Sequence, residues 1–107
     1  MQANRQEVFN QIHETVQSTV SKMYARIDSI IQSAKEYVEA NPEKGEEIVQ
    51  HVTNYTRYMH RVIDSIVEAY SAFLKSEEPN VKEFKENVSQ YITRAKNATL
   101  KIQSLIA

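Results

Sequence analysis

The sequence predicts an all-α protein, folded as an antiparallel, up-down-up bundle of three long helices. Glycine occurs once and proline twice in 107 residues, which leaves too few chain breakers for the turns of a multi-stranded sheet. Apolar residues recur every three or four positions along nearly the whole chain, and this spacing is interrupted only at 40–45 and 75–80. The expected boundaries are 1–107 for one domain and, for its helices, about 4–40, 42–75 and 80–106.

The first expected helix carries one apolar face and contains no glycine or proline. Side chains three and four residues apart lie on the same side of a helix, so this spacing predicts a long amphipathic helix. Its apolar positions are Phe9, Ile12, Val16, Val20, Met23, Ile27, Ile30, Ala34 and Val38.

The second and third expected helices carry apolar residues in alternating steps of three and four. This heptad spacing keeps an apolar stripe turned toward neighbouring helices that cross at shallow angles, as in a coiled coil. In the second helix the stripe consists of Ile48, Val52, Tyr55, Met59, Val62, Ile66, Ala69 and Phe73. In the third helix it consists of Val81, Phe84, Val88, Tyr91, Ala95, Ala98, Ile102 and Leu105.

The two interruptions carry residues that are typical of helix starts. Asn41 is the expected N-cap of the second helix, with Pro42 at the first helical position, where its missing amide proton costs nothing. Asn80 followed by Glu83 resembles a capping box at the start of the third helix. The last turns of that helix carry cations that complement the helix dipole: Arg94, Lys96 and Lys101.

Corners this short force consecutive helices to run antiparallel, and this fixes which residues lie at the same level. Facing residues should have numbers that add to about 83 across the first two helices and to about 155 across the last two. All three phenylalanines, Phe9, Phe73 and Phe84, are then expected in one layer at one end of a thin rod. The expected layer at the other end contains Ala34, Ile48, Val49, Leu105 and Ile106.

The length and three-helix layout resemble spectrin-type repeats, in architecture only. The tryptophan that marks the first helix of such repeats is absent, because the chain contains no tryptophan. The resemblance therefore implies a bundle of long helices and transfers no function.

Ile-Asp-Ser-Ile occurs twice, in RIDSII and again about five heptads later in VIDSIV. On their heptads, Asp28 and Asp64 are expected to face solvent, whereas Ile30 and Ile66 are expected in the core. The facing rule keeps the two Asp-Ser pairs apart within one molecule. The repeat is therefore interpreted as a packing preference rather than as a ligand site.

A second apolar stripe runs along the second helix beside its core seam. It consists of Ile63, Val67, Tyr70 and Leu74. A helix that touches two neighbours needs a wide apolar face, which is one explanation of this stripe. Val67 and Leu74, however, occupy heptad positions that usually point away from both neighbours. Together with Tyr58, the stripe is the candidate partner-binding site.

The sequence offers little for catalysis or metal binding. Cysteine is absent, one glycine cannot form a phosphate-binding loop, and no Glu stands three residues before a His, as a di-metal carboxylate bundle requires. His60 and Asp64 are one turn apart but lack a third ligand. We expect no enzymatic activity, no metal and no cofactor. A net charge of -1 argues against binding to nucleic acid.

Two classes of function remain. The first is a non-enzymatic protein–protein interaction or structural module that binds a partner helix or self-associates through the stripe on the second helix. The alternative is a lipid-surface protein with amphipathic helices, like exchangeable apolipoproteins or granule-coating proteins. A small apolar ligand held between the helices is a third, open interpretation. The pattern favours a soluble, cytoplasmic protein, but partner identity, oligomeric state and compartment are not determined by the sequence.

Overall fold

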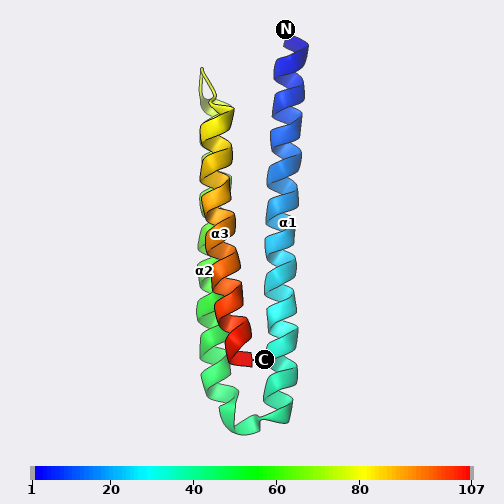
Figure 1. Cartoon of the computed structure of the whole chain (residues 1–107), viewed down its shortest axis with the longest axis vertical. Helices are drawn as coiled ribbons and strands as arrows, with labels where there is room; N and C mark the ends of the chain where they lie inside the picture. Colours follow the sequence, from blue (N-terminus) through cyan, green and yellow to red (C-terminus); the bar gives the residue numbers. More distant parts are fainter. Residues whose placement is uncertain (1, 107) are drawn as a thin grey trace.

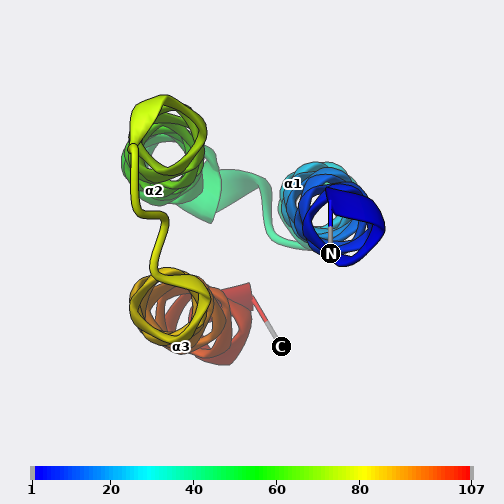
Figure 2. The ribbon, with the colours of Figure 1, turned by 90° about the horizontal axis from the view of Figure 1, so that it is seen from above.

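The computed structural model describes residues 2–106, which form three long helices packed lengthwise against each other (Figure 1). The helices are α1 (Gln2–Ala40), α2 (Gly45–Lys75) and α3 (Val81–Ile106), and a short 3-10 helix, η1 (Pro42–Lys44), precedes α2. Seen from the end, the three long helices stand at the corners of a triangle (Figure 2). The Cα extents of 61 × 17 × 17 Å describe a thin rod. The all-α, three-helix architecture predicted from the sequence is confirmed.

The layer of three phenylalanines confirms the expected register. The rings of Phe9 and Phe73 lie 5.6 Å apart between centroids, and those of Phe73 and Phe84 lie 5.0 Å apart. Two further pairs obey the same facing rule: His13 lies against Tyr70, and the hydroxyl of Tyr55 lies 2.8 Å from that of Thr99. The antiparallel order of the helices therefore follows from the lengths of the two corners.

The core follows the predicted seams along most of the rod. Buried apolar side chains come from all three helices, and the most deeply buried large ones are Ile12, Met59 and Ile66. At the end opposite to the phenylalanines, Ile48 and Ile106 are buried, but Val49 and Leu105 are exposed, so their expected place in this layer is wrong. The reason is geometric: neighbouring residues on a helix point about 100° apart, and only one of each pair can face the core.

The core also contains one polar residue that the apolar spacing missed. Thr99 is buried, whereas its neighbour Ala98, expected in the seam, is only partly buried. The Thr99 hydroxyl donates to the Ala95 carbonyl at 2.8 Å, and this bond uses its one hydrogen. The Tyr55 hydroxyl is therefore the donor in its bond to Thr99, and both buried hydroxyls are satisfied.

The first corner differs from the expectation at its cap. α2 begins at Gly45 rather than at Pro42, because Pro42–Lys44 form the 3-10 turn. Asn41 makes no side-chain cap bond to this turn; its amide Nδ2 instead donates to the Tyr37 carbonyl at 3.0 Å. Its backbone N–H donates to the same carbonyl at 2.9 Å. Asn41 thus satisfies the end of α1 rather than the start of α2.

The second corner agrees with the expectation. The Asn80 side-chain oxygen accepts a hydrogen bond of 3.0 Å from the backbone N–H of Glu83. The Asn80 carbonyl accepts one of the same length from the N–H of Phe84. The first bond satisfies one of the amide groups that a helix start leaves without partners, and the second is the first intrahelical bond of α3.

Candidate interaction surfaces

The repeated Ile-Asp-Ser-Ile has the arrangement that packing requires. Asp28 and Asp64 are exposed, and Ile30 and Ile66 are buried. The repeat therefore reflects two matched core positions on α1 and α2, and it does not bring the two Asp-Ser pairs together.

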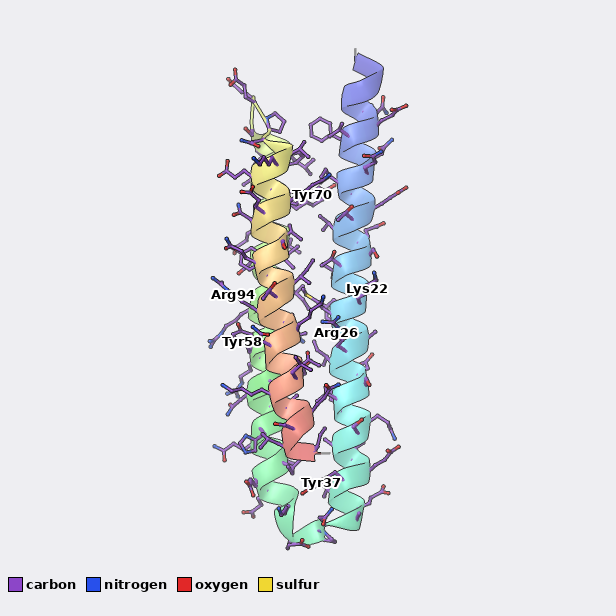
Figure 3. The ribbon with its side chains drawn as sticks, in the orientation of Figure 1. Lys22, Arg26, Tyr37, Tyr58, Tyr70 and Arg94 are labelled. Atoms are coloured by element: carbon purple, nitrogen blue, oxygen red, sulfur yellow. The ribbon has the colours of Figure 1, made fainter. Side chains whose placement is uncertain are left out.

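Two of the five predicted binding residues belong to the interior of the bundle. Ile63 is only 3% exposed, so its expected place in an exposed patch is wrong: it lies on the flank of α2 that packs against the rest of the core. Tyr70 is partly buried and lies between α1 and α2 (Figure 3). Its hydroxyl and His13 Nδ1 form a hydrogen bond of 2.8 Å, and its ring also lies 6.3 Å from that of Phe84.

Val67 and Leu74 remain at the surface, and each is 48% exposed. They are one heptad apart, as are His60 and Val67, so the three lie on one line along α2. At the lower end of this line His60 meets Tyr24 of α1 edge-to-face, with 6.0 Å between ring centroids, and Tyr24 is itself 47% exposed. We call these four residues, Tyr24, His60, Val67 and Leu74, the α1/α2 strip.

Tyr58 does not belong to this strip. It is 38% exposed and stands nine positions before Val67, which puts it roughly 180° away around the helix axis. Figure 3 shows Tyr58 with Arg94 on the side of the bundle that is turned away from α1. The five residues predicted as one site therefore lie in three different environments: the bundle interior, the α1/α2 strip and, for Tyr58, the side turned away from α1. The exposure of a residue on α2 depends on the positions of both neighbouring helices.

Tyr58 lines an open groove of about 790 Å³ between α2 and α3. Its floor contains the buried residues Tyr55 and Ile102 and the partly buried Ala98. Its edges carry polar and exposed apolar side chains: His51, Asn54, Tyr58, Arg94, Asn97, Leu100, Lys101 and Leu105. We call this the α2/α3 groove.

The groove has a positive edge. Arg94 and Lys101 line it, and among the described residues none of those that line it is an Asp or Glu. The guanidinium of Arg94 lies 5.6 Å from the centre of the Tyr91 ring and has no ion pair to a carboxylate within residues 2–106. His51 lies 3.8 Å from Glu47. The sequence pattern singled out Arg94 and Lys101 as partners of the helix dipole and missed that they border a groove.

The environment of Tyr55 changes its titration. Burial raises the pKa of Tyr55 above its ordinary value of 10.0, while the bond to Thr99 and the positive charge of Arg26 act in the opposite direction. Arg26 projects from α1 and is partly buried (Figure 3). The arrangement keeps the phenol neutral in a largely apolar setting.

The remaining polar side chains form no cluster suited to a metal ion. Across the described part of the chain, no three His, Asp or Glu residues are grouped closely enough to share one. His60 and Asp64, the pair noted in the sequence, are both exposed. No described helix contains a stretch long and apolar enough to cross a membrane.

The chain matches no protein-family model and has no significant similarity to a curated protein or a solved structure. Its surfaces therefore have to be interpreted from their own chemistry.

Proposed function

We propose that the chain is a non-enzymatic interaction module that self-associates through the α1/α2 strip. The observation that carries the proposal is the half-exposed pair Val67 and Leu74, aligned on one face of α2, whereas Ile63 of the same stripe is buried and Tyr70 is partly buried. Exposed apolar residues that line up along one face favour contact with another protein surface.

The strip suits a second copy of the same chain. In an antiparallel contact with its symmetry axis at Val67, the two Val67 side chains meet, and each Leu74 lies at the level of the partner's His60. Only Asp64 is charged among the four residues one helical turn from Val67, which are Ile63, Asp64, Tyr70 and Ser71. Low charge at the centre of a contact removes the repulsion that a symmetric pairing of like charges would create.

The size of the strip predicts weak, reversible association. It is about 21 Å long, from His60 to Leu74. The protein surface it offers is on the order of 300 Å², against about 800 Å² per partner in a stable complex. We therefore expect a monomer–dimer equilibrium that shifts with protein concentration in the micromolar range or above.

Light scattering over a wide range of concentration tests the proposal. The apparent mass should rise above the 12.4 kDa of one chain as concentration increases. The double variant Val67→Glu/Leu74→Glu should stay at the monomer mass with unchanged helical circular dichroism, because both carboxylates would be desolvated in the contact. Leu100→Glu, at an exposed leucine on α3 outside the strip, is the matched control and should associate like the wild type.

Two results contradict self-association. One is a wild-type monomer at every concentration; the other is a double variant that associates as the wild type does. If the monomer instead co-floats with vesicles of phosphatidylcholine and phosphatidylserine, and the double variant does not, the strip serves a lipid surface and the alternative function takes its place.

A further inference from the structure

The shape of the α2/α3 groove can accommodate one additional helix. It lies between two antiparallel helices, and the residues that line it on α3 extend from Arg94 to Leu105. This stretch is about 16 Å long, or three helical turns. A helix placed there would convert the three-helix bundle into a four-helix bundle with an apolar contact along Tyr58, Leu100 and Leu105, the exposed apolar residues of the groove.

The positive charge of the groove indicates what charge a bound helix should carry. Arg94 and Lys101 line its α3 edge, and both are exposed. Neither has a carboxylate partner among the described residues. Unpaired cations beside exposed apolar side chains complement an amphipathic helix whose apolar face is flanked by Asp or Glu.

The same charges disfavour other occupants. A second copy docked symmetrically in the groove would bring Arg94 and Lys101 close to the same cations of its partner, a repulsive arrangement. Nucleic acid would leave the exposed apolar side chains of the groove uncovered, and its two cations supply too few phosphate contacts at physiological salt. An amphipathic protein helix with acidic residues complements both the cations and the apolar side chains of the groove.

We infer that the α2/α3 groove binds an acidic amphipathic helix of a partner protein, in addition to the self-association through the α1/α2 strip. The apolar face of the partner lies over Tyr58, Leu100 and Leu105, and its carboxylates pair with Arg94 and Lys101. Three turns of contact are a small interface, so the expected affinity is in the micromolar range.

The probe is a fluorescein-labelled helical peptide of four turns, with leucine at i, i+3, i+4 and i+7 and glutamate beside them. Fluorescence anisotropy should show saturable binding to the wild-type chain. Binding should weaken at least tenfold in Arg94→Glu/Lys101→Glu and should not change in Lys35→Glu/Lys82→Glu, which alters the net charge equally at exposed lysines away from the groove. A peptide with lysine in place of glutamate should bind Arg94→Glu/Lys101→Glu more tightly than it binds the wild type.

Absence of saturable binding to the acidic peptide overturns the inference. Equal losses in the two double variants also overturn it, because they would mean a general response to net charge rather than a site. The monomeric variant Val67→Glu/Leu74→Glu should bind the acidic peptide as the wild type does. This arm separates the groove from the strip, so that either proposal can fail alone.

Discussion

At the scale of single residues, Tyr55 and Thr99 are the clearest departure from an apolar core. A buried hydroxyl without a partner is costly, and each of these two has one: Tyr55 donates to Thr99, and Thr99 donates to the Ala95 carbonyl. The pair joins α2 to α3 at one level. Tyr55 also lines the α2/α3 groove.

The Tyr55→Phe variant should be less stable than the wild type at pH 8, by about 1 kcal/mol, because one buried hydrogen bond is lost. The raised pKa of Tyr55 gives this difference a pH dependence. A raised pKa means that the neutral phenol stabilises the fold fully below pH 10.0 and that this contribution is lost as the pH rises through the folded-state value. The advantage of the wild type should therefore shrink above pH 10.0.

Urea unfolding of both proteins, followed by circular dichroism at pH 8 and again above pH 10.0, measures this change. A wild-type advantage that stays constant or grows with pH contradicts the proposed role of burial. Phenylalanine is the appropriate substitute because it keeps the ring in the core and removes only the hydroxyl.

Heptad position predicts burial for most residues. It does not predict which residues of the candidate binding site on α2 are buried and which are exposed. Ile63 and Tyr58 occupy flanks on opposite sides of the α2 core seam, and the sequence of one helix cannot tell which flank a neighbour will cover. That information lies in the lateral placement of α1 and α3. Combining the flank positions of α3 with those of α2 would have placed Tyr58, Arg94 and Lys101 on one surface from the helical pattern itself.

At the scale of elements, the single glycine marks a corner without being required there by its backbone. Gly45 has φ -53° and ψ -50°, the ordinary right-handed helical conformation. A Cβ at this position would lie 3.5 Å from Val38 Cγ1, an ordinary van der Waals contact. Glycine at the start of α2 therefore adds freedom to the unfolded chain and gains nothing in return in the fold.

Gly45→Ala should stabilise the protein by about 0.4–1 kcal/mol, because alanine restricts the unfolded chain more than glycine does and its methyl group reaches Val38. Thermal unfolding followed by circular dichroism should show a midpoint higher by about 2–6 °C. A lower midpoint would mean that the backbone at this corner differs from the helical conformation described.

The two corners also show how far capping residues can be predicted. Asn80 acts as the sequence pattern indicates, because its side-chain oxygen accepts a hydrogen bond from the N–H of Glu83. Asn41 follows directly on α1, and its side chain donates to the Tyr37 carbonyl instead of capping η1. Asparagine carries both a donor and an acceptor, so it can satisfy either end of a helix.

At the scale of the whole molecule, a net charge of -1 conceals an uneven distribution of charge. In and around the corner between α1 and α2, the glutamates outnumber Lys35 and Lys44: Glu36, Glu39, Glu43, Glu46 and Glu47. Cations border the α2/α3 groove higher up the rod. The apolar α1/α2 strip lies on another face, so the chain presents two chemically different surfaces.

The fold class was predictable because length, helical periodicity and short corners together fix the up-down-up order of three helices and the residues that lie at the same level. The surfaces were predictable only in part. Val67 and Leu74 are exposed as their heptad position indicates, but the groove depends on the distance between two helices, which no pattern along one helix contains.

The antiparallel register places residues from all three helices in one layer, and both proposed surfaces depend on it. Nuclear Overhauser effects between aromatic ring protons test this register most directly, in a sample with the three phenylalanines isotopically labelled. We expect cross-peaks between Phe9 and Phe73 and between Phe73 and Phe84, whose ring centroids lie 5.6 and 5.0 Å apart. A Phe73 with cross-peaks to neither of the other two would contradict the register, and with it both proposed surfaces.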